Sequence, residues 1–309
     1  MATSLSVTSQ AWASKCGRRL YRSICLADGL GKKQEGETKM SQTQKDASRK
    51  VLVTGGANGF GMETARALLA QGAQVAIGDI DKPQLEKATA ELDNPNLLPL
   101  ELDVSSKTSV QASVAACKEN FGGLDALVNS AGVIQIAPLS EVTEEKWDWV
   151  INVDLRGVFL MSQAAAPLLS QSGRGRIVNI GSDASKIGFP QVHAYVAAKH
   201  GVAGLTKSLA GELASSKVTV NCVCPVGAPT TGMGEFVLSW KMDVTGLTPE
   251  EIMAATAADI PLKRNATEAD IANAIMFFLA DASDFLTGIV LDVDGGMLST
   301  IPLPGAADA

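Results

Sequence analysis

The sequence is poor in the residues that build metal sites and disulfide frameworks. Its 309 residues include two His and five Cys, and the cysteines are irregularly spaced. An odd, irregular set argues against a disulfide framework, and two histidines are too few for a histidine-based metal site. Cys222 and Cys224 lie in a strand-like run, where we expect their side chains to point to opposite faces and to share no metal. The sequence therefore predicts no metal site.

Aromatic residues and long apolar runs are also scarce. Aromatic residues make up 5% of the chain and hydrophobic residues 46%, which is ample for a substantial core. No apolar run approaches the roughly 18 residues of a membrane-spanning helix. The net charge of −7 is uneven, since residues 1–50 carry ten Lys or Arg against four Asp or Glu. The acidic remainder would repel a phosphate backbone, which argues against nucleic acid as a partner.

The first 48 residues differ in composition from the rest of the chain. Residues 1–27 are basic, rich in Ser and Ala and free of Asp and Glu, a composition typical of organelle transit peptides. Residues 31–48 are polar and are interpreted as a linker. Two alternatives stay open: a transit segment of a mitochondrial or plastid protein, or a disordered extension of a cytoplasmic one. Residues 299–309 are expected to form a C-terminal tail.

From Lys50 onward, short β-branched runs alternate with amphipathic stretches. The pattern predicts a single Rossmann-type α/β domain over residues 49–298, with a doubly wound parallel sheet flanked by helices. Residues 228–262 are too long for an ordinary connection, and their apolar, Met-rich composition predicts a small lid over a substrate. Strands are predicted at residues 51–54, 75–79, 97–103, 126–129, 176–180, 218–223 and 290–293. Helices are predicted at 62–71, 82–92, 106–120, 143–169 (with a bend), 194–213 and 268–279.

A glycine-rich turn follows the first predicted strand and opens the first helix. Gly55, Gly59 and Gly61 have the T-G-x-x-x-G-x-G spacing. Glycine allows a tight turn and lets backbone N–H groups approach a pyrophosphate, which the helix N-terminus then faces. Asp79 ends the second strand, where a carboxylate can accept both ribose hydroxyls and would repel a 2′-phosphate. The sequence therefore favours NAD over NADP.

Tyr195 and Lys199 are four residues apart, so on a helix they share one face. The ammonium can favour the phenolate, and the phenol can exchange a proton with a substrate oxygen. Ser182 follows the strand at 176–180, and its hydroxyl can hold the same oxygen. These groups suit the oxidation of an alcohol or the reduction of a ketone without a metal.

Together these motifs resemble the short-chain dehydrogenase/reductase family over about residues 50–298. The resemblance rests on Thr54–Gly61, Asp103-Val104, Asn129–Gly132, Ser182 and the Tyr195/Lys199 pair. It implies a nicotinamide dinucleotide as cofactor and assigns catalytic roles to Asn152, Ser182, Tyr195 and Lys199. Asn152 would position a water that links Lys199 to solvent, and Lys199 would also bind the nicotinamide ribose. The family commonly pairs its long helices across a two-fold axis, which implies a homodimer or homotetramer.

The two predicted sets of contacts are as follows. The residues expected to contact the cofactor are Gly55, Asn58, Gly59, Phe60, Gly61, Asp79, Ile80, Asp103, Val104, Asn129, Ala131, Gly132, Tyr195, Lys199, Pro225, Ala228 and Thr230. Those expected to flank the substrate are Gln135, Asp183, Phe189, His193, Met233, Phe236 and Trp240. Phe60, Ser130 and Val226 depart from the family's usual residues, and Val226 puts the nicotinamide-facing turn in doubt.

The predicted activity is NAD(H)-dependent interconversion of a hydrophobic secondary alcohol and its ketone, because the lid is apolar and holds one Lys before Lys263. Two alternatives remain: an NADP(H)-dependent carbonyl reductase with the same catalytic residues, and a catalytically silent nucleotide-binding protein.

Overall fold

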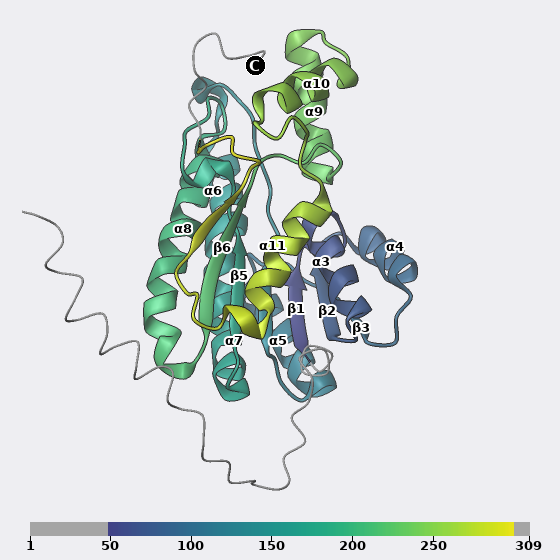
Figure 1. Cartoon of the computed structure of the whole chain (residues 1–309), viewed down its shortest axis with the longest axis vertical. Helices are drawn as coiled ribbons and strands as arrows, with labels where there is room; N and C mark the ends of the chain where they lie inside the picture. Colours follow the sequence, from purple (N-terminus) through teal and green to yellow (C-terminus); the bar gives the residue numbers. More distant parts are fainter. Residues whose placement is uncertain (1–48, 300–309) are drawn as a thin grey trace, which may run out of the picture. The chain divides into compact units, whose positions relative to one another are not determined.

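The computed structural model describes residues 49–299, which form a seven-stranded parallel sheet with helices on both faces (Figure 1). The strand order is β3-β2-β1-β4-β5-β6-β7. The strands are β1 (Lys50–Thr54), β2 (Gln74–Asp79), β3 (Leu97–Glu101), β4 (Ala126–Asn129), β5 (Arg176–Ile180), β6 (Thr219–Pro225) and β7 (Val290–Val293). This order is that of a doubly wound, Rossmann-type sheet, so the predicted fold class is confirmed. The transit and tail predictions concern residues 1–48 and 299–309, which lie outside the described range except for Ser299.

Helices connect every pair of successive strands. They are α3 (Gly59–Ala70), α4 (Lys82–Leu92), α5 (Lys107–Phe121), α6 (Glu144–Ile151), α7 (Gly157–Ser172), α8 (His193–Leu213), α9 (Gly232–Thr245), α10 (Pro249–Asp259) and α11 (Glu268–Leu279). Short 3-10 turns are η1 (Leu139–Glu141), η3 (Asp183–Ser185), η4 (Ala214–Ser216) and η5 (Asp281–Ser283). In Figure 1, α9 and α10 lie beyond one end of the sheet, within the segment predicted as a lid.

Polar side chains at the helix N-termini explain where most helices begin. Thr231, Thr248 and Thr267 each accept a hydrogen bond from a backbone N–H in the first turn of α9, α10 and α11. Ser106 does the same for α5. Such caps satisfy N–H groups that have no partner inside the helix, so these starts are encoded locally.

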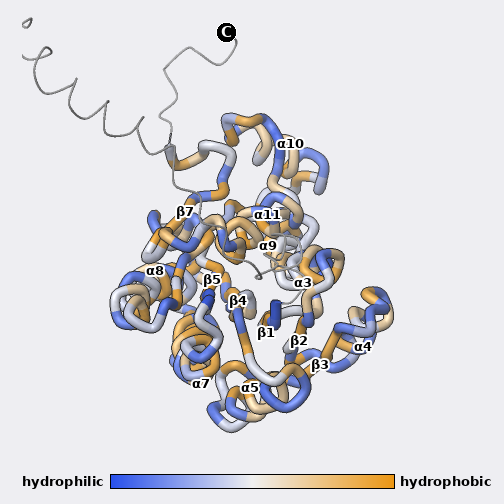
Figure 2. Tube along the Cα trace, turned by 60° about the horizontal axis from the view of Figure 1, so that its bottom comes forward, coloured by the Kyte–Doolittle hydropathy of each residue, from blue (hydrophilic) through white to orange (hydrophobic). Residues whose placement is uncertain are grey.

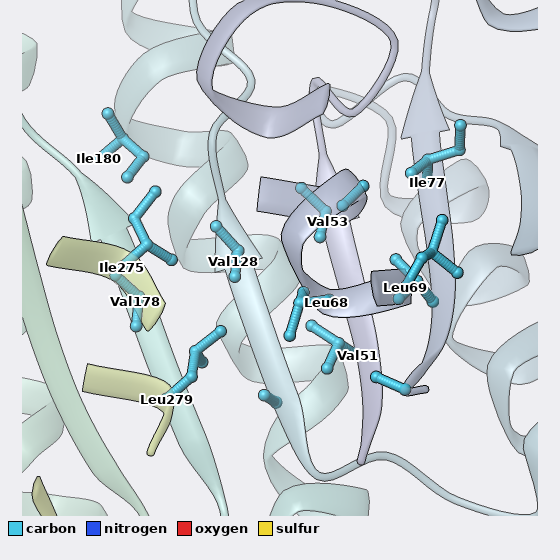
Figure 3. Close-up of a cluster of buried hydrophobic side chains, with 14 of the residues drawn as sticks. Val51, Val53, Leu68, Leu69, Ile77, Val128, Val178, Ile180, Ile275 and Leu279 are labelled. Atoms are coloured by element: carbon cyan, nitrogen blue, oxygen red, sulfur yellow. The ribbon is translucent and has the colours of Figure 1, made fainter. Parts of the chain in front are cut away.

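The core is divided between the two faces of the sheet. Val51 and Val53 of β1 pack with α3 and α11 on one face, whereas Leu52 packs with α5 and α7 on the other. Figure 3 shows the first face, where side chains from β1, β4 and β5 meet Leu68 and Ile275. The central strands are buried on both sides, as parallel sheets are. The outer helices α4 and α5 carry both hydrophilic and hydrophobic stretches (Figure 2).

The long helix predicted at residues 143–169 is interrupted. A π-helical turn, η2 (Asn152–Arg156), separates α6 from α7, and the Gly157 N–H donates to the Asn152 carbonyl. This bond spans five residues instead of four, so the turn is wider and the helix that follows is rotated. The predicted bend is thus a π-helical turn. Its position matters for the site, because it reorients the side chains at 152–156.

Candidate active site

A cavity of about 860 Å³ opens at the carboxyl ends of the strands, between the glycine-rich turn and the lid helices α9 and α10. It includes the ends of β1 and β4, where the strand order reverses. Doubly wound sheets bind their ligands at this point. Most of the residues predicted for the cofactor line it: Gly55, Asn58, Gly59, Phe60, Asp79, Ile80, Asp103, Val104, Ala131, Gly132, Tyr195, Lys199, Pro225 and Ala228.

The glycine-rich turn brings backbone close to backbone at the start of α3. Gly55 has a φ of +62°, and a Cβ there would lie 2.8 Å from the Ala131 Cα. A Cβ on Gly61 would overlap the Gly55 carbonyl oxygen and lie 2.9 Å from the carbonyl carbon. Gly61 is not among the described residues that line the cavity, so it acts by closing the turn. The result is a helix N-terminus that faces the cavity and can hold a phosphate group.

Two carboxylates lie at the end of the cavity nearest β2 and β3. Asp79 accepts hydrogen bonds from the backbone N–H groups of Ala57 (3.2 Å) and Asp81 (3.1 Å). Asp103 accepts from the Ser105 backbone N–H (2.9 Å) and hydroxyl (2.6 Å). These bonds hold both carboxylates in place beside the turn.

Asn129 does not line the cavity within the described range. Its amide donates to the Asn179 side-chain oxygen (2.8 Å) and so ties β4 to β5. Thr54 Oγ1 accepts from the backbone N–H groups of Ser130 and Ala131, both at 3.1 Å. These contacts fix the loop after β4, which brings Ala131 and Gly132 to the cavity.

Ser182, Tyr195 and Lys199 converge on the same cavity. Ser182 follows β5, while Tyr195 and Lys199 lie one turn apart on α8, with the Lys199 Nζ 5.4 Å from the centroid of the Tyr195 ring. Ser182 lies close enough to Tyr195 to lower the pKa of its phenol. The Ser182 hydroxyl also donates to Asp183 Oδ1 at 2.6 Å. A phenol, an ammonium and a hydroxyl thus share one wall of a cleft that can hold a dinucleotide.

Burial shifts the protonation of these groups. Burial raises the pKa of Tyr195, Lys199 lowers it, and Asp154 raises it again, so that the net shift is upward. For Lys199, burial alone lowers the pKa, but Asp154 and Tyr195 raise it, and the net shift is again upward. The ammonium therefore keeps its charge, and the phenol keeps its proton to higher pH than a free tyrosine.

The side chain that contacts Lys199 from the α6–α7 helix is Asp154, not Asn152. Asp154 is fully buried, with Oδ2 3.2 Å from the Lys199 Nζ. Neither Asp154 nor Asn152 is among the described residues that line the cavity. Two residues apart on a helix point to nearly opposite sides, so only one can face α8. The predicted role of Asn152, to position a water that links Lys199 to solvent, stays a prediction. In the sequence, Asp154 is a single carboxylate within an apolar helical stretch. Such a group is rarely buried without a partner, so this feature could have pointed to Asp154 as a partner for Lys199.

Thr230 is not among the described residues that line the cavity. Its hydroxyl is exposed and donates to Glu268 Oε2 (3.0 Å), whereas the next residue, Thr231, lines the cavity and caps α9. Val226, which departs from the family's usual residue after Pro225, is buried.

The predicted substrate residues divide into three groups. Asp183, Phe189, Met233 and Trp240 line the main cavity. Gln135 and Phe236 line a second hollow of about 450 Å³, which shares Met233 with the first. His193 is in neither lining within the described range. Sequence reasoning missed Trp149, which lines both hollows.

The cysteine prediction is wrong in its geometry. Cys222 and Cys224 point to the same side of β6, with their Sγ atoms 3.8 Å apart, because side chains two residues apart in a strand share a face. Residues 49–299 contain no group of three His, Cys, Asp or Glu arranged to hold a metal. In the same range, no helix combines the length and the apolar character needed to span a bilayer.

Comparison with known proteins identifies the family. The family model described as Enoyl-(Acyl carrier protein) reductase matches residues 55–298. The 2-(S)-hydroxypropyl-CoM dehydrogenase 3 of Xanthobacter autotrophicus is 34% identical over 249 residues, 80% of this chain and 95% of the relative. The chain belongs to the short-chain dehydrogenase/reductase family.

Other short-chain dehydrogenases/reductases are similar over the same length. The L-2,3-butanediol dehydrogenase of Corynebacterium glutamicum is 36% identical over 258 residues, covering 81% of this chain and 99% of that one. Among solved structures, actinorhodin polyketide ketoreductase with NADPH has a TM-score of 0.78 at 32% identity, covering 82% and 99% of the two chains. Levodione reductase has a TM-score of 0.76 at 30% identity, covering 82% and 98%. The relatives are oxidoreductases that act on alcohol or keto groups.

Proposed function

We propose that the protein is an NAD(H)-dependent oxidoreductase that interconverts a hydrophobic secondary alcohol and its ketone. The observation that carries the proposal is the convergence of Ser182, Tyr195 and Lys199 on the cavity that the glycine-rich turn also lines. The close approach of Gly55 to Ala131 leaves no room for a side chain at position 55, which fits a pyrophosphate held by backbone N–H groups of the turn. A bound nicotinamide would accept or supply the hydride.

Residues of the chain itself can carry out the transfer of the substrate hydroxyl proton. The Ser182 hydroxyl and the Tyr195 phenol hold the substrate oxygen, and the phenol takes its proton during oxidation or returns it during reduction. The Lys199 ammonium lies close enough to stabilise the phenolate that forms. Burial of the site strengthens these interactions because less water screens them.

NAD is the proposed cofactor because of the charges around the adenosine end. Asp79 is held by two backbone N–H groups with its carboxylate at the cavity. Among the described lining residues the only cations are Lys199 and Lys241, neither of which belongs to the glycine-rich turn or to β2. A 2′-phosphate would therefore meet a fixed negative charge, and none of the described lining residues of the glycine-rich turn or β2 is a cation that could offset it.

Replacing Asp79 with Asn should raise the affinity for NADP relative to NAD by about tenfold or more. The amide removes the charge that repels the 2′-phosphate and keeps one oxygen, which can accept from one of the two N–H groups, Ala57 or Asp81, that Asp79 now binds. The measurement is the Kd of each cofactor for both proteins. Asp93→Asn is the matched control, because Asp93 is an exposed residue at the end of α4 and outside the cavity lining. Tighter binding of NADP than NAD by the unaltered protein would refute the cofactor choice.

The lid supports an apolar substrate. Met233, Val237, Leu238, Trp240 and Met253 contribute apolar side chains to the cavity. A panel of cyclic and aromatic secondary alcohols, incubated with NAD⁺ while NADH absorbance is followed, tests the activity. Turnover of these alcohols, but not of dianionic ones, is the expected result. An absence of turnover in both directions, with NAD still bound, would favour a silent nucleotide-binding protein.

An NADP(H)-dependent ketoreductase is the second candidate. The observation that favours it is the similarity to actinorhodin polyketide ketoreductase, whose structure contains NADPH. The catalytic residues proposed here would serve either cofactor, so the binding experiment on Asp79 separates the two candidates.

We also propose that copies of the chain associate through α6, α7 and α8. Trp147 of α6 and Phe159 of α7 are 38% and 43% exposed, so both helices present an aromatic side chain that a second copy could cover. Sedimentation at micromolar concentration should therefore give a dimer or tetramer. A monomer under these conditions would contradict the proposal.

A further inference from the structure

Asp154 is a carboxylate with no access to solvent, held in the π-helical turn between α6 and α7. One oxygen, Oδ1, accepts the Val133 backbone N–H at 2.8 Å. The other, Oδ2, lies 3.2 Å from the Lys199 Nζ. Charged groups are rarely buried to this extent unless they are paired. Burial raises the pKa of Asp154, and the Lys199 ammonium opposes that shift and favours the carboxylate.

The pair is tightly enclosed. A Cβ on Gly132 would lie 3.3 Å from Asp154 Oδ2 and 3.5 Å from the Lys199 Nζ. Lys199 also donates to the Ile180 carbonyl at 3.1 Å. Carboxylate, carbonyl and phenol thus surround one ammonium, and the carboxylate fixes where that ammonium sits relative to Tyr195.

Asp154 also has an electrostatic effect on the phenol. Lys199 favours the phenolate of Tyr195, and the negative charge of Asp154 opposes it. The remaining groups that face the pair are Ser182 and Asp183 after β5, and Cys222 of β6. Asp183 likewise disfavours the phenolate, whereas Ser182 favours it.

We propose that Asp154 is a positioning residue that holds Lys199 beside Tyr195 and partly cancels its charge there, so that alcohol oxidation requires a higher pH than a neutral residue at 154 would impose. This inference rests on the proposed function of the same site. Oxidation needs the phenolate, whereas ketone reduction needs the protonated phenol, so Asp154 extends the pH range in which the site reduces ketones.

The upward pKa shifts of Tyr195 and Lys199 agree with the geometry. Burial is the largest cause for Tyr195, and Asp154 adds to it. Removing the Asp154 charge therefore lowers the pKa of the phenol and moves the acidic limb of oxidation to lower pH.

The test is Asp154→Asn, which keeps an oxygen for the Val133 N–H and removes the charge. Its kcat for NAD⁺-linked oxidation is measured against pH beside that of the unaltered protein. The acidic limb should move down by about one pH unit. Asp148→Asn removes an exposed charge from the neighbouring helix α6 and should leave the profile in place. A limb that stays in place or moves up, or a uniform loss of kcat at every pH, would overturn the inference.

A second readout does not depend on turnover. The chain has two tyrosines, Tyr21 and Tyr195, so a Tyr21→Phe background leaves Tyr195 as the only phenol. Its ionisation can then be titrated by near-ultraviolet absorbance with and without Asp154→Asn. Phenolate formation at lower pH in the variant supports the inference even if no alcohol in the panel is oxidised, which separates its failure from that of the proposed function. An unchanged titration contradicts it.

A third variant covers the case in which Asp154→Asn does not fold. Combining it with Lys199→Met removes both charges, so no buried ion is left unpaired. The double variant should unfold at a higher urea concentration than either single variant, because each single change leaves one charge alone. A double variant no more stable than both singles would show that the two groups are not coupled, and would overturn the inference.

Discussion

Tyr195→Phe is expected to lower kcat for alcohol oxidation by about 10²- to 10⁴-fold, which is the range that general acid–base catalysis supplies. Phe keeps the ring, which packs with Val150, Ala194 and Ala198, and loses only the phenol oxygen. The fold and the glycine-rich turn are untouched by the change. Dinucleotide affinity should therefore stay within a few-fold of the original, so that the loss appears in kcat and not in cofactor Kd.

The measurement is steady-state kcat with the best alcohol of the panel, together with a cofactor binding titration. Tyr21→Phe is the matched control, because it makes the same chemical change at the only other tyrosine in the chain, and its kcat should be unaltered. A Tyr195→Phe protein that keeps a tenth or more of the original kcat would remove the phenol from the proposed proton transfer.

The sheet could be predicted from the sequence because each strand is a short, mostly apolar run, and the central strands are buried on both faces. Residues 126–129, 176–180 and 290–293 have the bounds that their β-branched runs predict. The helices Lys82–Leu92 and Glu268–Leu279 also match, since a polar cap marks each start. Where an element is determined by its own residues, its hydrophobic period and its capping residue are enough to predict its bounds.

The π-helical turn that contains Asp154 was harder to predict from the sequence, because one hydrogen bond determines its geometry. The bond from the Gly157 N–H to the Asn152 carbonyl changes the local period, and nothing in the hydrophobic pattern of residues 143–169 marks it. An amide at 152 and a carboxylate at 154 both offer an oxygen to Lys199. Only the observed helix phase shows that Asp154 faces α8.

The loop after β6 shows another reason why the sequence alone does not identify every residue at the cavity. Thr230 and Thr231 are identical in chemistry, and a shift of one residue decides which one faces the cavity. Thr231 takes that place because its hydroxyl also accepts the Gly234 N–H and donates to the Ala228 carbonyl at the start of α9. Tertiary fit of the lid therefore selects between residues that sequence alone treats as equivalent.

Gly61→Ala is expected to destabilise the fold by about 3 kcal/mol or more, at the upper end of the cost of overpacking a core. The new Cβ would overlap the Gly55 carbonyl oxygen and lie 3.1 Å from the Gly56 Cα, so backbone atoms would have to move apart. The same displacement withdraws the turn from the position in which its N–H groups can reach a pyrophosphate. Dinucleotide affinity should fall by at least about tenfold in the molecules that remain folded.

Urea unfolding measures the first effect, and a cofactor titration below the unfolding transition measures the second. Gly211→Ala provides the control, since Gly211 lies in α8, where an added Cβ would point into open space with no neighbouring atom within 4 Å. There the added methyl should stabilise the helix by about 0.5–1 kcal/mol, because alanine loses less backbone entropy than glycine. Opposite signs at the two glycines would tie the effect to the close approach at the turn. If Gly61→Ala instead matches Gly211→Ala in stability and in NAD affinity, the turn tolerates a side chain and cannot be the rigid cradle on which the cofactor assignment depends.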